Sequence, residues 1–163
     1  MLIAMILCSC VGCDQVTKIA AQHHLPSSQP VTLMGGVFQF QYSTNRGAFL
    51  GLGGRLPDAV RFWSLTILVG VVLVGMLGFV WASPEMSHPV SILGVCLVIG
   101  GGLSNLIDRL LNDGAVVDFM NMGVGNLRTG IFNLADVAIV AGGGILLAWS
   151  LFFRGAGKTE QAS

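Results

Sequence analysis

Charged residues are scarce in this 163-residue sequence, of which only 10% is Asp, Glu, Lys or Arg. A soluble domain carries about 25% charged residues, so the composition argues against a soluble fold. The net charge is zero, and nothing in the composition indicates nucleic acid as a partner. Aromatic residues are few, whereas 53% of the residues are hydrophobic and the mean hydropathy is +0.78. These values predict a polytopic membrane protein.

Common catalytic and metal-binding motifs are also missing. The sequence has no G-x-S-x-G and no H-E-x-x-H, and its three histidines are scattered. Cys8, Cys10 and Cys13 could be interpreted with the next histidines as a metal cluster, or L-C-S-C as a lipidation site at Cys10. Helical neighbours point apart, so we expect small packing residues there, with no disulfide, metal or cofactor.

Four apolar segments are each long enough to cross a bilayer, which takes about 20 helical residues. They lie at about 1–21, 59–81, 90–110 and 132–153. An even number of spans places both termini on one side of the membrane. The loops 22–58 and 111–131 then lie together on the other side. We expect one four-helix domain over 1–153, a polar link over 111–131, and a disordered tail over 154–163.

A strand pattern interrupts the first of these loops. V-F-Q-F-Q-Y alternates apolar and polar residues, which is typical of a β-strand. A turn at 45–47 and a second strand or Gly-rich loop are expected to follow. The prediction is an all-α membrane protein with a small extramembrane sheet at about residues 31–52.

Polar residues between Asn105 and Asp136 are the chemical centre of the sequence, because each costs about 2.5–3.5 kcal/mol at the middle of a membrane helix. Asp118 and Asp136 have apolar neighbours and could form a two-carboxylate hydrolytic site. At ~4 Å and an effective dielectric near 20, two such charges repel by about 4 kcal/mol, so the pair would share a proton. Alternatively, both carboxylates cap helices or pair with Arg109 and Lys18.

Two further polar groups have helical spacing. Asp14 and Lys18 are four residues apart and share a helix face, either as a mutually neutralising pair or as a brace for the polar site. Asn105, Asp108 and Arg109 lie on one face at the end of the third segment. The even span count brings both groups to the membrane face that carries Asp118 and Asp136.

Five blocks, in order, resemble the signal peptidase II family of bacterial membrane aspartic proteases, the lipoprotein signal peptidases. They are D-Q-V-T-K at 14–18, N-R-G-A-F at 45–49, G-G-L-S-N-L-I-D-R at 101–109, G-A-V-V-D-F at 114–119 and F-N-L-A-D at 132–136. The resemblance implies an endopeptidase of the bacterial inner membrane, with cytoplasmic termini and a site near the periplasmic face.

The same resemblance implies a substrate and a set of roles. The substrate would be a diacylglyceryl-modified prolipoprotein, cleaved before its lipidated cysteine. Membrane lipid and globomycin-type peptide inhibitors would be partners, and we expect a monomer. Asp118 and Asp136 would be catalytic. The residues that match the family's supporting positions are Asp14, Lys18, Asn45, Gly47, Asn105, Asp108, Arg109 and Asn133.

Some features differ from the family pattern. L-R-T-G-I precedes the last block, where many members have Trp or Pro, and this affects the expected substrate or inhibitor fit. Charge bias taken alone would place the polar site in the cytoplasm. A small transporter or channel whose Asp residues bind cations, or an inactive relative that binds precursors, are the alternative functions.

Overall fold

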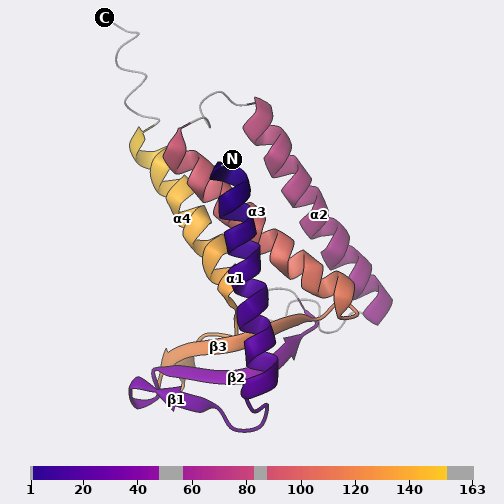
Figure 1. Ribbon diagram of the computed structural model, residues 1–163, viewed down its shortest axis with the longest axis vertical. Helices are drawn as coiled ribbons and strands as arrows, with labels where there is room; N and C mark the ends of the chain where they lie inside the picture. Colours follow the sequence, from indigo (N-terminus) through magenta and orange to yellow (C-terminus); the bar gives the residue numbers. More distant parts are fainter. Residues whose placement is uncertain (1, 48–56, 83–87, 154–163) are drawn as a thin grey trace, which may run out of the picture.

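Four long apolar helices form the body of the molecule in the computed structural model, which describes residues 2–47, 57–82 and 88–153 (Figure 1). They are α1 (Leu2–His24), α2 (Asp58–Ala82), α3 (Pro89–Leu111) and α4 (Leu134–Phe153). Each is long and apolar enough to span a bilayer. The expected membrane architecture is confirmed. The tail 154–163 lies outside the described residues.

Helix α3 is the central helix of the bundle, since it packs against each of the other three (Figure 1). Its glycines allow this close packing. A Cβ on Gly100 would lie 2.9 Å from Cys10 of α1, and one on Gly102 would lie 2.8 Å from Leu73 of α2. A Cβ on Gly101 would collide with the backbone oxygen of Ala135, so α3 and α4 meet here almost backbone to backbone.

The glycines of α2 do not repeat this arrangement. Gly70, Gly75 and Gly78 have no described atom within 4 Å of an added Cβ. These glycines therefore lie away from the contact that Leu73 of α2 makes with Gly102 of α3. Cys8 and Cys13 of α1 are likewise exposed rather than packed, whereas Cys96 of α3 is buried.

A four-stranded antiparallel sheet covers one end of the helices, opposite the end where α1 begins and α4 terminates (Figure 1). Its order is β1 (Val31–Leu33), β2 (Phe38–Asn45), β3 (Val116–Val124) and β4 (Leu127–Arg128), with the short helix η1 (Met34–Gly36) joining the first two. The predicted sheet is confirmed, but half of it comes from the segment expected to be a polar link. A second strand or loop at 48–52 lies outside the described residues.

Buried neighbours explain why β3 was missed. Residues 116–119 are buried on both faces, so the sequence there lacks the alternation that marks a half-exposed strand. Two helix ends also differ from expectation. Helix α1 continues to His24 instead of ending at Ala21, and α4 begins at Leu134, because Phe132 forms a β-bridge with Met120.

Candidate active site

Asp118 lies in strand β3, not in a loop as expected, and its residue is only 2% exposed. Strand pairing sets it opposite Ser43 of β2. Its carboxylate accepts a hydrogen bond of 3.1 Å from Asn45 Nδ2 and one of 2.7 Å from Asn133 Nδ2. Asn45 is oriented in turn by the backbone N–H of Gly47, which donates to Asn45 Oδ1 over 2.9 Å. The turn that follows β2 therefore holds one side of Asp118.

Asp136 lies in the first turn of α4, where the sequence analysis expects it. The backbone N–H of Asp136 donates to Asn133 Oδ1 (2.9 Å), and Asp136 Oδ2 accepts from the N–H of Asn133 (3.2 Å). This reciprocal pair is a capping box, in which two side chains satisfy free donors at a helix start. Asp136 is thus a capping residue, and its other oxygen still faces Asn105 Nδ2 at 2.9 Å.

Asn133 joins the two carboxylates. Its side chain is fully buried, caps α4 through Oδ1 and reaches Asp118 through Nδ2. Asn105 of α3 is its neighbour, with 3.1 Å between Asn133 Nδ2 and Asn105 Oδ1. Strand β3 and helix α4 thus bring Asp118 and Asp136 to Asn133, which contacts both. Asn105 of α3 contacts Asn133 and Asp136.

Behind the asparagines lies a buried ionic cluster that links α1 to α3. Lys18 Nζ is 2.6 Å from Asp14 Oδ2, 2.9 Å from Asp108 Oδ2 and 2.9 Å from Asn105 Oδ1. The spacing of Asp14 and Lys18 allows either a neutral pair or a brace for the polar site, and in the structure the two residues serve both purposes. Asp14 accepts from the N–H of Ala135 at the start of α4 (2.7 Å), and Asp108 accepts from the N–H of Val117 in β3 (3.0 Å).

Sequence reasoning missed two members of this cluster. Gln15 Nε2 donates to Asp108 Oδ1 over 2.7 Å and lies 3.0 Å from Ser104 Oγ, and Ser104 Oγ donates to Asp14 Oδ2 over 2.7 Å. Ser104 is four residues before Asp108 and so shares its helix face. That spacing was the available signal, whereas Gln15 gives no such signal.

Arg109 is buried beside the same network. Its Nη1 donates to the backbone oxygen of Asn105, and its Nε has no partner among the described residues. Arg109 lies one residue beyond Asp108, and its own carbonyl accepts from Gly114 in the turn before β3. The structure brings together all ten predicted site residues. It forms no group of three or more His, Cys, Asp or Glu that could hold a metal among the described residues.

The electrostatics of Asp118 differ from those of an ordinary carboxyl. Burial raises the pKa of Asp118 to about 7, although the hydrogen bond from Asn45 acts in the opposite direction. The nearby charge of Asp136 raises the pKa further, while the amide of Asn133 and the charge of Lys18 lower it. A carboxyl with a pKa raised this far can hold its proton near neutral pH, as a general acid requires.

Comparison with known proteins assigns the family. A model described as "Signal peptidase (SPase) II" matches residues 6–153. This chain belongs to the signal peptidase II family. It is therefore a peptidase. The lipoprotein signal peptidase of Maridesulfovibrio salexigens is 34% identical over 129 residues, which covers 79% of this chain and 81% of the relative.

A second relative covers nearly the whole molecule. The lipoprotein signal peptidase of Clostridioides difficile is 32% identical, over 94% of this chain and 97% of its own length. The fold is similar to a solved structure described as a bacterial membrane enzyme, determined by the in meso method at 2.3 Å resolution. The TM-score is 0.78 with 22% identity, covering 92% of this chain and 87% of that one.

Proposed function

We propose that this signal peptidase II family member is an aspartic endopeptidase that removes the signal peptide from diacylglyceryl-modified prolipoproteins, cleaving before the lipidated cysteine. The relatives are named lipoprotein signal peptidases, which supports the substrate class. The observation that carries the mechanism is the contact of Asp118 and Asp136 with one asparagine, Asn133. Their other side-chain partners are also neutral amides, those of Asn45 and Asn105.

The two carboxyls take different roles in this proposal. Asp118 is nearly fully buried and carries the proton, whereas Asp136 is more exposed and ionised. Asp136 accepts a proton from a water molecule as the water oxygen attacks the carbonyl carbon before the cysteine. Asp118 donates its proton to the carbonyl oxygen as that oxygen becomes negative. The product of this step is an uncharged tetrahedral diol.

Collapse of the diol completes the reaction. Asp136 returns its proton to the nitrogen of the leaving cysteine residue while the carbon–nitrogen bond breaks. Asp118 recovers a proton from one of the diol hydroxyls, which becomes the new carbonyl of the signal-peptide product. One water is consumed, one peptide bond is broken, and both aspartic groups regain their starting states. This sequence of steps needs neither metal nor cofactor.

The remaining predicted residues have positioning roles in the proposal. Asn45, Asn105 and Asn133 orient the two carboxyls. Gly47 holds Asn45. Arg109 adds a positive charge beside the buried polar network. Asp14, Lys18 and Asp108 fix the start of α4 against β3. Globomycin-type peptides would compete for the same two carboxyls.

The proposed location is the bacterial inner membrane, with cytoplasmic termini, a periplasmic site and a cytoplasmic tail at 154–163. Charge bias argues against this orientation, but three of the cations on the site side have internal partners. Lys18 bonds to Asp14 and Asp108, Arg109 to Asn105, and Arg128 to Gly36. Because these cations have internal partners, their positions reflect contacts within the protein and not the membrane orientation alone. We further propose that 1–153 acts as one domain and as a monomer.

Cleavage of a purified diacylglyceryl prolipoprotein tests the proposal. Asp118→Asn and Asp136→Asn should each lower the rate by about a thousandfold or more, because each removes a proton-transfer group. Asp113→Asn is the matched control, since Asp113 is exposed and lies in the turn before β3. All three variants should accumulate in membranes. Full activity of either dyad variant would disprove the mechanism, and failure of the native protein to cleave the precursor would disprove the substrate.

A further inference from the structure

The extramembrane sheet has two chemically different faces. Along β3, Met120, Met122 and Val124 share the face of Asp118, because successive strand residues alternate. Residues directly opposite in antiparallel strands also share a face. The register therefore adds these apolar residues from the other strands: Val31, Leu33, Phe38, Phe40 and Leu127.

Beyond the buried Phe119, the opposite face is polar. The register places Thr32, Gln39 and Asn121 there. Arg128 joins them, with Nη1 donating to the backbone oxygen of Gly36 over 2.9 Å. The charge of β4 is therefore held on the polar face, next to the turn between β1 and β2.

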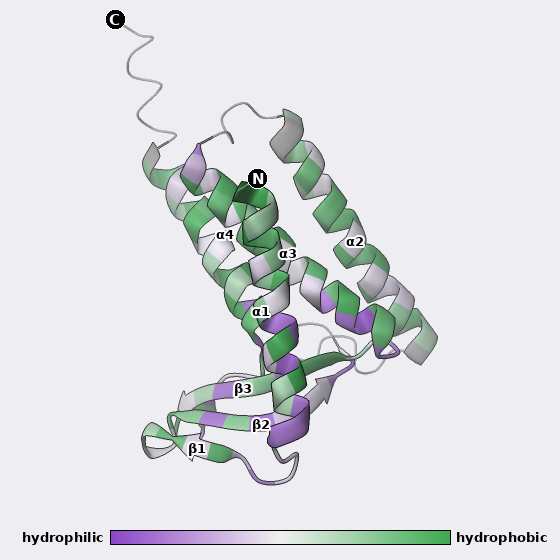
Figure 2. Ribbon diagram, viewed as in Figure 1, coloured by the Kyte–Doolittle hydropathy of each residue, from purple (hydrophilic) through white to green (hydrophobic). Residues whose placement is uncertain are grey.

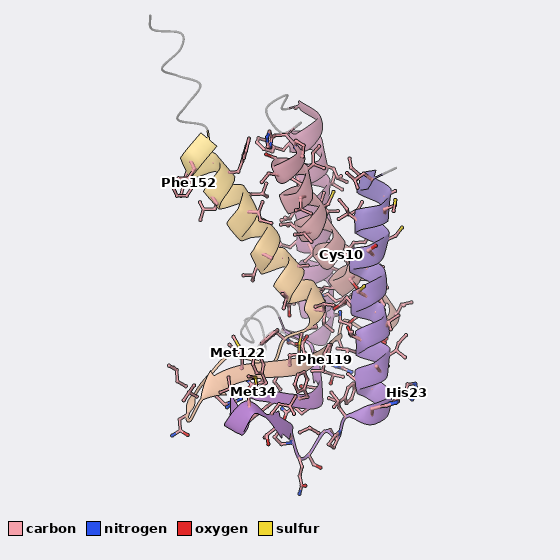
Figure 3. The ribbon with its side chains drawn as sticks, turned by 60° about the vertical axis from the view of Figure 1, so that its left-hand side comes forward. Cys10, His23, Met34, Phe119, Met122 and Phe152 are labelled. Atoms are coloured by element: carbon pink, nitrogen blue, oxygen red, sulfur yellow. The ribbon has the colours of Figure 1, made fainter. Side chains whose placement is uncertain are left out.

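The apolar face is turned toward the ends of the helices. Asp118 on this face contacts Asn133, which caps α4 immediately before that helix enters its span at Leu134. Met120, the next residue on the face, is bridged to Phe132. Beyond Met120 the strand extends past the helices: Figure 3 shows Met122 and Met34 on the part of the sheet farthest from His23 and α1.

No described element covers the end of this face. Val124 is 74% exposed and Leu127 is 86% exposed, although they are paired across the β3–β4 hairpin, and Met122 is also exposed. In Figure 2 green segments alternate with white and purple ones at this end of the sheet, as expected for strands with one apolar and one polar face. Exposed apolar groups that continue a membrane-facing surface normally contact lipid.

We propose that Met122, Val124 and Leu127, here called the hairpin tip, insert into the bilayer interface. The lipid contact holds β3 at a constant height. Because Asp118 lies in the same strand four residues before Met122, the hairpin tip sets the depth at which Asp118 meets a membrane-embedded substrate. The inference needs only the four spans and the sheet, so it stands or falls separately from the peptidase mechanism.

Thiol labelling in lipid nanodiscs tests the depth of the hairpin tip. The four native cysteines all lie in spans and can be replaced by alanine. Leu127→Cys is then compared with Thr32→Cys, an exposed position on the polar face of β1. The Leu127→Cys thiol, if it lies at the interface, should react with a charged maleimide at no more than about one tenth of the rate of the Thr32→Cys thiol. The reason is that raising the thiol pKa by one unit lowers the reactive thiolate tenfold.

A fluorescence measurement avoids the cysteine-free background. Leu127→Trp in lipids with brominated acyl chains should be quenched relative to the parent protein, and Thr32→Trp should not. Equal labelling rates together with equal quenching would overturn the proposal. So would protection of Leu127→Cys that appears only with added lipidated precursor, which would indicate a peptide site. Protection that requires two protein copies per disc would overturn it in favour of a dimer contact.

Discussion

The buried polar network contains two pairs of carboxylates that are held in different ways. Asp14 and Asp108 both contact the ammonium of Lys18 and each accept a backbone hydrogen bond as well. Asp118 and Asp136 are held by asparagine amides and form no salt bridge within the part of the chain that the structure describes. A cation beside a buried carboxylate strongly favours its ionised form, whereas a neutral amide orients the carboxylate and favours ionisation only in part, so that burial can still raise the pKa of Asp118. The first arrangement suits a framework and the second suits proton transfer.

The largest expected effect comes from removing the cation of the framework pair. Lys18→Met leaves Asp14 and Asp108 buried without a countercharge, which should lower the free energy of unfolding by about 3–5 kcal/mol. Thermal unfolding in detergent micelles measures this loss. Val16→Met, at an exposed position on the same helix, is the control and should leave stability nearly unchanged. A stable Lys18→Met protein would show that this cluster is not the framework.

Removing the amide between Asp118 and Asp136 should have a smaller effect on stability. Asn133→Ala removes the cap of α4 and one partner of Asp118, which should cost about 1–3 kcal/mol. Cleavage should fall as well, because both carboxyls lose a shared orienting group. Asn121→Ala is a useful comparison, since Asn121 lies in the same sheet but bonds to Arg128 and Thr129. Equal losses of activity in the two variants would contradict a specific role for Asn133.

The smallest effect concerns pH. In the proposed mechanism Asp118 must be protonated to act as the acid, and burial raises its pKa to about 7, so cleavage should decline as pH rises through that value. The Asn45 amide lowers this pKa. Asn45→Ala should therefore move the alkaline limb of the rate profile upward by about one pH unit. A pH–rate profile measures the shift, and a downward shift would assign the limb to another group.

Much of the molecule could be predicted from local chemistry. The four spans follow from hydropathy, since any helix of that length and composition favours the bilayer. The F-N-L-A-D block predicts a helix start, and Asn133 and Asp136 do form its capping box. The polar residues of α3 share a face because helical spacing requires it.

Other features could not be predicted because they depend on partners that are distant in sequence. Asp118 is in a strand only because β2 lies beside it, and the buried run around it hides the strand period. Glycine content does not show that α3 is the central helix and α2 is not, because both helices are glycine-rich and have similar hydropathy. Gln15 is recognisable as a site residue only once α3 is in place beside it.

The sequence by itself determined that this chain crosses a membrane four times and which polar residues end up on one side, because both follow from local hydropathy and helical periodicity. The tertiary structure alone decided which distant groups complete the carboxylate contacts: Asp108 joins Lys18, and Asp118 and Asp136 meet asparagine amides. That choice depends on contacts between residues such as Asp14 and Ala135, which are far apart along the chain and 2.7 Å apart, Oδ1 to N, in space.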